Sequence, residues 1–316
     1  METKYSYQDV ALVPSVISEI EHRSECILPS PLPIFTAPMT TVVGKECAGE
    51  YEKNDIIPIL PRPESIADRL ENKEGWSAFS LSEFEEHYLN APSLPACSKA
   101  LIDIANGHMA LLYRLIFQAK QRYGAALTVM IGNIANPKTY ALCDAAGADY
   151  VRVGIGAGKG CITSSNTAIH YPMASLIKET AEEKKALNGR CRIVADGGIR
   201  DYADVVKALA LGADAVMIGS VFSGLEGTPG EVTTDGYKKF YGMASREGQI
   251  DMKGEKTHTA EGTVKLVKVT GTIPGWVCNM KDYLRSAMSY CGARTLSEFK
   301  PEIVILSEGT KQTINR

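Results

Sequence analysis

The sequence predicts a single (β/α)8 TIM barrel, and three observations support this fold. Short apolar runs that favour β-strands recur eight times, helix-like segments separate them, and glycine-rich exits cluster after the sixth, seventh and eighth runs. A doubly wound sheet is the competing fold, but it usually has fewer strands and a glycine signature after the first of them. We therefore expect one barrel domain over residues 1–316.

The eight predicted strands are short, and several are followed at once by Gly, Pro, Asn or Asp, as strand exits should be. In chain order they are Ile34–Ala37, Ile56–Leu60, Trp76–Phe79, Ala100–Ile104, Leu127–Ile131, Tyr150–Val153, Arg192–Ala195 and Ala215–Ile218. Helices are expected between them, among others at Met109–Lys120, Tyr140–Ala146 and Asp201–Leu211, because apolar residues recur there at helical spacing.

One segment interrupts this alternation. Residues 221–278 are polar and glycine-rich and show no further strand and helix pair. An insertion after the last strand lies on the catalytic face of a barrel, so we expect a mobile flap over the site. A disordered surface loop without function is the competing interpretation.

The composition is that of an ordinary globular protein, with 45% hydrophobic residues, 22% charged residues and a net charge of -3. The 34 Lys and Arg against 37 Asp and Glu argue against a basic nucleic-acid binder. The sequence contains neither an 18-residue apolar stretch nor an apolar secretory signal at its start. A cytoplasmic enzyme without nucleic-acid or membrane partners is expected.

The eight cysteines form no C-x-x-C pair, which leaves zinc and thioredoxin-like sites poorly supported. We expect all eight to be reduced thiols, and seven of them to be small buried apolar residues. The exception is Cys161, which ends the run Gly154-Ile-Gly-Ala-Gly-Lys-Gly-Cys161 after the sixth strand. Such a loop lets backbone approach a ligand closely and presents the thiol to a pocket, so Cys161 is a candidate nucleophile.

Two further strand exits indicate a phosphorylated ligand. The seventh strand ends in Asp196-Gly197-Gly198 and the eighth in Gly219-Ser220. In barrels these two loops often bind phosphate through backbone N–H groups and a helix N-terminus. Plain tight turns would also explain the glycines. Asp196 suits ribose hydroxyls rather than the phosphate itself.

Two other segments are candidates for the pocket. Asp103-Ile-Ala-Asn106 follows the fourth strand, and its polar side chains should point into the barrel mouth, although Asn106 could instead cap the next helix. The segment Tyr241-Gly242-Met243-Ala244 opens the insertion. Its small residues would let backbone groups read a planar ring.

Taken together, these motifs resemble the family of IMP dehydrogenase and GMP reductase. The resemblance covers most of the chain, from Tyr7–Pro14 to Ser286–Ala293. It is carried by Ala37–Thr41, Gly132-Asn133, Gly154–Cys161 with Thr163, Ala195–Ile199, Ile218–Ser220, Tyr241–Met243 and Ala260–Gly262. The family fold is the same barrel, usually assembled as a homotetramer.

The resemblance implies that Cys161 attacks C2 of a purine nucleoside monophosphate, and that Thr163 and Glu261 relay the proton for the leaving amine. Hydride would come from NADPH or NADH. The implied nucleotide contacts are Lys159, Asp196, Gly197, Gly198, Gly219, Ser220, Tyr241, Gly242, Met243 and Ala244. The implied cofactor contacts are Asp103, Ile104, Ala105, Asn106, Ile155 and Gly156, with Ser286 and Ser289 reaching a neighbour's cofactor. The carbonyl groups of Gly156, Gly158 and Cys161 match a potassium site.

Three features favour a GMP reductase over an IMP dehydrogenase. Ala105-Asn106-Gly107 resembles the reductase segment, the flap from Glu247 to Glu261 has neither arginine nor tyrosine to activate water, and the chain has no room for a CBS-type module. Departures from the family pattern are Ala157, Lys159, Ile162, Ser164 and His258. They leave open the oxidation of IMP or the reduction of a related purine nucleotide. A nucleotide-binding barrel without catalysis and a flavin-dependent barrel enzyme also stay open as interpretations.

Overall fold

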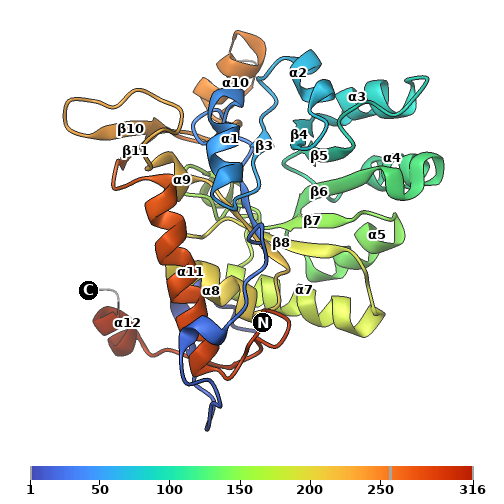
Figure 1. Ribbon diagram of the computed structural model, residues 1–316. Coiled ribbons are helices and arrows are strands. Elements are labelled where there is room, and N and C mark those ends of the chain that lie inside the picture. The colour runs from blue at the N-terminus through green and yellow to red at the C-terminus, as the bar shows by residue number, and fades with distance from the viewer. Residues whose placement is uncertain (1, 256–257, 315–316) are drawn as a thin grey trace.

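Eight parallel strands close into a barrel at the centre of the structure (Figure 1). The structure is a computed structural model that describes residues 2–255 and 258–314. The order around the barrel is β2-β9-β8-β7-β6-β5-β4-β3. Two backbone hydrogen bonds close it between β2 and the residues before β3, from Thr36 N to Ile57 O at 3.0 Å and from Ile57 N to Ile34 O at 2.9 Å. The predicted (β/α)8 barrel is confirmed.

The strand bounds agree well with the prediction. The strands are β2 (Ile34–Thr36), β3 (Ile59–Leu60), β4 (Trp76–Phe79), β5 (Lys99–Asp103), β6 (Thr128–Ile134), β7 (Tyr150–Val153), β8 (Arg192–Asp196) and β9 (Ala215–Ile218). Three of them, β4, β7 and β9, have the predicted limits, and the ends of the others differ by at most three residues.

Helices follow the strands and cover the outside of the barrel (Figure 1). They are α1 (Lys45–Lys53), α2 (Ile66–Glu71), α3 (Leu81–Phe84), α4 (Ala110–Tyr123), α5 (Tyr140–Ala145), α6 (Thr163–Thr167), α7 (Met173–Leu187), α8 (Tyr202–Ala210), α9 (Ser220–Ser223), α10 (Arg246–Lys253), α11 (Ile273–Tyr290) and α12 (Glu308–Ile314). The three predicted helices are present as α4, α5 and α8. None of the described helices is long and apolar enough to cross a membrane.

Two small antiparallel sheets lie outside the barrel, and the prediction missed both. Strand β1 (Val10–Val13) pairs with β12 (Glu302–Ile305), which brings the two ends of the chain together. Strand β10 (Tyr237–Phe240) pairs with β11 (Lys265–Lys268) within the insertion. These strands are short and depend on partners far away in the chain, so local sequence carries little signal for them.

The insertion after β9 therefore has more structure than the sequence indicated. It contains the β10–β11 hairpin and α10, and the predicted range 221–278 also extends too far, because α11 already begins at Ile273. Thr272 caps that helix by accepting a hydrogen bond from Gly275 N at 3.2 Å. The insertion proper ends at this cap.

The barrel interior is filled by one set of inward-facing side chains, among them Phe35, Ile59, Leu101, Met130 and Val194. A second, larger cluster fills the space between the strands and the helices. Five cysteines are buried as predicted, but Cys291 is only half-buried and Cys278 is exposed on α11, so the prediction was wrong for these two. Helical spacing places Cys278 on the solvent side of α11 between the buried Val277 and Met280.

Candidate active site

The loop that carries Cys161 leaves the barrel at the carboxyl end of β7 and leads into α6. Gly154 starts this loop with a φ of +143°, and a Cβ atom there would lie 2.0 Å from the carbonyl oxygen of Asp196. Only glycine fits such a position. Tight packing against β8 thus fixes the path of the loop, and Cys161 remains half-buried rather than part of the core.

Cys161 begins a chain of hydrogen bonds between side chains. Its Sγ donates to Thr163 Oγ1 at 3.3 Å, and the Thr163 hydroxyl donates to Glu261 Oε2 at 2.8 Å. Glu261 lies 98 positions further along the chain than Thr163. The fold therefore joins three predicted residues into one path along which a proton can move between a thiol and a carboxylate.

Backbone pairing holds Glu261 in this place. Thr263 N donates to Gly160 O at 2.8 Å, and Ile162 N donates to Glu261 O at 3.0 Å. Cys161 and Gly262 thus face one another in a short antiparallel bridge. The end of the insertion pairs with the loop that carries Cys161, residues 154–162 (the nucleophile loop), as one strand pairs with another. Backbone hydrogen bonds therefore fix the position of Glu261 in addition to the contact of its side chain.

The same part of the insertion brings the predicted base-reading segment to the site. Glu261 N donates to Ala244 O at 3.0 Å, which ties residues 242–244 to the relay. Thr41 Oγ1 donates to Tyr241 O at 3.3 Å, and the Tyr241 hydroxyl donates to Asp251 at 3.0 Å. Burial and the neighbouring carboxylate of Asp251 raise the pKa of Tyr241. The Tyr241 ring is thus an anchor for this segment.

One of the two predicted phosphate loops, the one at residues 196–198, lies beside the loop that carries Cys161. A Cβ atom on Gly197 would lie 3.1 Å from Ala157 Cβ, so the two loops are in van der Waals contact there. Gly198 N donates to Ala157 O at 3.0 Å, and the contact of Gly198 with phosphate stays a prediction. In the described part of the chain the Ser220 hydroxyl and the exposed ammonium group of Lys159 have no hydrogen-bond partner.

A buried ion cluster lies beneath these loops. Arg152 Nη1 donates to Asp103 Oδ1 at 2.5 Å, and its Nε and Nη2 donate to Asp196 Oδ2 at 3.1 and 2.8 Å. Asn133 Nδ2 adds a further hydrogen bond to Asp196 Oδ2 at 2.7 Å. Burial works against the charged guanidinium, but Asp196 and Asp103 outweigh it and raise the pKa of Arg152.

The cluster leaves two oxygens available to a ligand. Among the described residues neither Asp196 Oδ1 nor Asp103 Oδ2 has a hydrogen-bond partner, because all contacts fall on the other oxygen of each carboxylate. Both carboxylates are oriented by Arg152, and they lie at the carboxyl ends of β5 and β8, with β6 and β7 between them. Two such acceptors suit hydroxyl groups of sugars.

Arg152 and Asn133 belong to this site but were not among the predicted site residues. A signal for Arg152 was present, because side chains in a strand alternate between faces and Arg152 shares the inward face of β7 with Tyr150. A charge inside a barrel requires partners, and the acidic exits of β5 and β8 supply them. Room for it comes from Gly132, where a Cβ atom would lie 2.5 Å from Arg152 Cβ.

The remaining predicted cofactor residues fall into two groups. Asp103 ends β5 on the catalytic face, and Ile104, Ala105 and Asn106 follow it. Asn106 does not cap α4, whose first turn follows Met109, and its Oδ1 instead accepts a hydrogen bond from His108 N at 3.1 Å. His108 in turn joins this loop to the next one by accepting from Ala135 N at 3.1 Å.

Ser286 and Ser289 lie in the second half of α11, about 20 Å or more along the helix from its start at Ile273. Arg23 Nη1 donates to Ser286 Oγ at 3.3 Å, and Ser18 Oγ donates to Ser289 O at 2.7 Å. Figure 1 shows this end of α11 beside the N-terminal segment. A role toward a neighbouring subunit stays a prediction.

The predicted potassium ligands are partly engaged within the loop. Gly156 O accepts a hydrogen bond from Ser164 Oγ at 3.2 Å, and Gly158 O accepts one from Cys161 N at 3.0 Å. A carbonyl oxygen has two lone pairs, so both can still bind a cation. Carbonyl oxygens suit a hard cation, and the donor set is therefore compatible with potassium.

A cleft of about 1010 Å³ lies at the opposite end of the barrel and is not the candidate active site. It is lined by residues from the amino ends of the strands, including Trp76, Lys99, Tyr150 and Arg192, and contains none of the predicted site residues. Barrel enzymes carry out their chemistry at the carboxyl ends of the strands. The position of Cys161 and its relay decides in favour of that end.

Comparisons with known proteins show the family to which the chain is related. A family model described as IMP dehydrogenase / GMP reductase domain matches residues 96–314. A protein named GMP reductase from Oceanobacillus iheyensis is 32% identical to this chain, over 95% of this chain and 94% of its own length. Proteins of the same name from Clostridium acetobutylicum and Mesoplasma florum are 32% and 30% identical, over 95% and 94% of this chain and 94% and 95% of their own lengths.

Proposed function

Because the chain belongs to the IMP dehydrogenase and GMP reductase family, we propose that it is an oxidoreductase that converts GMP to IMP with release of ammonia. The observation that carries this proposal is the path from Cys161 Sγ through Thr163 Oγ1 to Glu261 Oε2. A nucleophile next to a proton relay suits the displacement of an amine. Neither group would be needed in a protein that only binds nucleotides.

In the proposed reaction Cys161 Sγ forms a bond to C2 of the guanine, and the bond from C2 to the exocyclic nitrogen breaks. The thiol proton travels through Thr163 and Glu261 to the amine, which leaves as ammonia. Addition of a hydride to C2 then breaks the C2–S bond, gives IMP and returns Cys161 as a thiolate that takes up a proton. The overall reaction consumes one hydride and one proton for each ammonia released.

The binding roles of the other residues follow from their positions. Asp196 Oδ1 would accept from a ribose hydroxyl, while Oδ2 is held by Arg152 and Asn133. Gly197, Gly219 and Ser220 would bind the phosphate, and residues 242–244 would read the base beside Glu261. A nucleotide bound in this way would have C2 of its purine near Cys161, between residues 242–244 and the loop that carries Cys161.

A nicotinamide cofactor, NADPH or NADH, would supply the hydride when bound. The residues present fit it, because Asp103 offers a free carboxylate oxygen toward a cofactor ribose at the end of β5. Ile155 and Gly156, in the nucleophile loop, would pack against the nicotinamide. Assembly as a homotetramer would let Ser286, Ser289 and Arg23 serve the cofactor of a neighbour.

We expect the purified protein to consume NADPH when it is given GMP and to release one ammonia for each cofactor oxidised. The test is a panel of IMP, XMP, GMP and modified purine monophosphates, each with reduced and oxidised cofactor, in potassium and in sodium buffer. Loss of the reduced-cofactor absorbance and ammonia formation are both recorded. Faster turnover in potassium would support the carbonyl site at residues 156–161.

Different outcomes of the panel would indicate different functions. Formation of NADH from IMP without any reaction of GMP would contradict the proposal and indicate a dehydrogenase. Reaction of only a modified purine would show that the base pocket has changed with His258 and Ser164. Yellow protein would point to a flavin enzyme, and nucleotide binding without turnover to a sensor.

Lys159 supplies a second test of the site. If its exposed ammonium group contacts the nucleotide phosphate as a point charge, Lys159→Ala should weaken GMP binding by roughly 5- to 20-fold at low salt. The difference from the wild type should shrink as salt is raised, because screening weakens exposed charge pairs. Isothermal titration with GMP at several salt concentrations measures both effects.

Lys253 is a suitable control for this charge change, since it is an exposed lysine at the end of α10, in the insertion, and matches no phosphate segment. Lys253→Ala should leave the affinity for GMP unchanged. An unchanged affinity in Lys159→Ala as well would mean that Lys159 faces solvent in the complex.

A further inference from the structure

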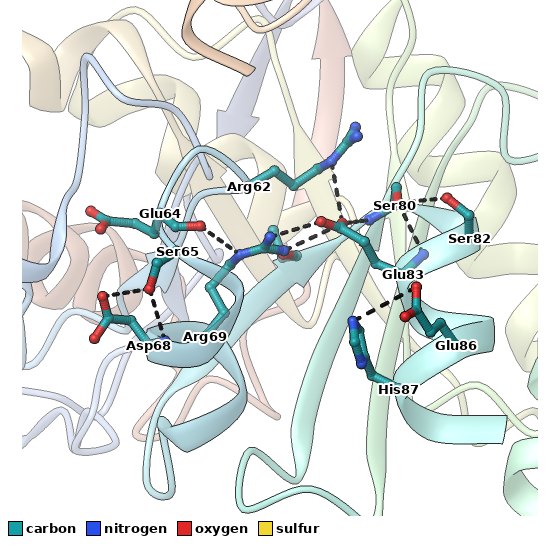
Figure 2. A network of polar contacts seen from close by, with 11 residues as sticks. Arg62, Glu64, Ser65, Asp68, Arg69, Ser80, Ser82, Glu83, Glu86 and His87 are labelled. Carbon is teal, nitrogen blue, oxygen red and sulfur yellow. Dashed lines mark hydrogen bonds and ion pairs between the residues drawn. The ribbon is translucent and has the colours of Figure 1, made fainter. Parts of the chain in front are cut away.

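A buried ion pair lies at the carboxyl ends of β3 and β4, on the catalytic face of the barrel (Figure 2). Arg69 is 3% exposed, and its Nη1 and Nη2 donate to the two carboxylate oxygens of Glu83 at 3.3 and 2.8 Å. Its Nε and Nη1 also donate to the carbonyl oxygens of Glu64 and Ala78 at 3.0 and 2.7 Å. The Arg69 guanidinium is therefore fully used inside the protein.

Glu83 is equally well held. Its Oε2 accepts a hydrogen bond from Ser80 N at 2.7 Å, and the Ser80 hydroxyl accepts one from Glu83 N at 3.1 Å, so the two residues cap α3 reciprocally. Burial alone would raise the pKa of Glu83, but the bonds from Arg69 and Ser80 outweigh it and lower the pKa to about 2. Glu83 is ionised at neutral pH, and Arg69 balances its charge.

Arg62 is different, because nothing in the described chain uses its guanidinium fully. Its Nε lies 3.9 Å from Glu83 Oε2, which is an ion-pair distance but too long for a hydrogen bond. This nitrogen is buried and has no hydrogen-bond partner. Figure 2 shows the terminal nitrogens of Arg62 directed away from Glu83 and from the rest of the network.

The charges of this group do not cancel. Arg69 and Glu83 neutralise one another, so the positive charge of Arg62 remains for an anion at the barrel mouth. Prolines on both sides, Pro61 and Pro63, restrict the backbone that carries it. A guanidinium with two free terminal nitrogens suits a phosphate group, which it can bind with two parallel hydrogen bonds.

The position of Arg62 identifies the molecule that would bring the phosphate. Arg62 follows β3 and Glu83 follows β4, and β4 lies next to β5, whose end carries Asp103, the proposed contact of the cofactor ribose. The loops after β8 and β9 are the proposed site of the nucleotide phosphate, and around the closed barrel they lie four and three strands from β4. The second phosphorylated molecule of the proposed reaction is the dinucleotide cofactor.

We propose that Glu83, itself fixed by buried Arg69, is a positioning residue that orients Arg62 for a phosphate group of the cofactor. This inference rests on the proposed function and adds two residues, Glu83 and Arg69, that act at a distance from the reacting atoms. The long contact to Nε restrains the Arg62 side chain before the cofactor arrives. Less side-chain freedom is then lost on binding, which increases the affinity.

The test is a double-mutant cycle read by titration calorimetry with NADP+, NAD+, 2′,5′-ADP and GMP. Glu83→Gln should raise the Kd for NADP+ by roughly 3- to 10-fold, the factor that corresponds to the ordering of one long side chain, and leave the Kd for GMP unchanged. Arg62→Gln should raise the Kd for NADP+ at least as much. The double variant should match Arg62→Gln alone, because Glu83 acts only through Arg62.

Two controls separate positioning from folding. Glu83→Gln removes the counter-charge of a buried arginine and will lower the melting temperature, but a Kd does not depend on the fraction of folded protein. Glu83→Asp keeps the charge and should recover part of the lost affinity for NADP+. Glu86→Gln makes the same charge change at a neighbouring, 72% exposed carboxylate and should have no effect.

The ligands identify the phosphate. If Glu83→Gln raises the Kd for NADP+ and 2′,5′-ADP but not for NAD+, Arg62 contacts the 2′-phosphate. If it raises the Kd for NADP+ and NAD+ equally, Arg62 contacts the pyrophosphate. The inference would be overturned if Glu83→Gln leaves the Kd for NADP+ unchanged or lowers it, or if the increases in Kd caused by the two substitutions multiply in the double variant. In that case, turnover of GMP by the wild type would still uphold the proposed function. A wild type that neither binds nor converts GMP would remove both.

Discussion

Replacement of Cys161 by alanine is expected to abolish turnover, with a loss of at least about 10³-fold in kcat, and to leave GMP binding within about twofold of the wild type. The thiol is the atom that would form the bond to C2, and no other cysteine belongs to the nucleophile loop. The loop itself should persist, since Gly154, Gly160 and the bridge to Gly262 hold its backbone. Stopped-flow absorbance of the cofactor and calorimetric titration with GMP measure the two quantities.

Cys278→Ala is the matched control, because Cys278 is the exposed thiol on α11 and has no part in the site. It should retain full activity. Mass spectrometry after incubation with GMP alone should show a nucleotide adduct on the wild type and on Cys278→Ala, and none on Cys161→Ala. Near-normal turnover by Cys161→Ala would show that Cys161 is not the nucleophile.

Glu261→Gln is expected to slow the release of ammonia by about 10² to 10⁴-fold, the usual range for loss of a general acid or base. The amide is nearly isosteric, and the backbone bonds from Glu261 N to Ala244 O and from Ile162 N to Glu261 O do not involve the side chain. The flap should therefore stay in place, and the amide oxygen can still accept the hydrogen bond from Thr163, while the carboxylate that can take up and release a proton is lost.

Single-turnover experiments separate the two chemical steps. Ammonia release is followed in a quench experiment, and hydride transfer is followed in the reverse direction from IMP and oxidised cofactor, which needs no amine. Glu255→Gln, an exposed carboxylate elsewhere in the insertion, is the control and should behave like the wild type. Equal slowing of both steps in Glu261→Gln would contradict a relay that serves the amine alone.

Much of the fold could be predicted from local sequence, because barrel strands are buried on both sides and therefore appear as apolar runs with polar or glycine exits. Strand β7 shows this well, since Tyr150–Val153 has the predicted bounds and Gly154 follows directly. The edge strands β1 and β10 had no such signal. Each depends on a distant partner, β12 and β11, for its hydrogen bonds.

The candidate site divides in the same way. The sequence by itself determined the barrel, and it singled out the candidate nucleophile Cys161 in its glycine-rich loop and the proposed phosphate loops at the ends of β8 and β9, because a glycine or a thiol at a strand exit reflects a requirement of its immediate neighbours. Only the tertiary structure decided that Glu261 reaches Thr163, that Arg152 joins Asp103 to Asp196, and that Glu83 faces Arg62. These contacts join residues that are well separated along the chain, and the closure of the barrel and the pairing of the flap create them.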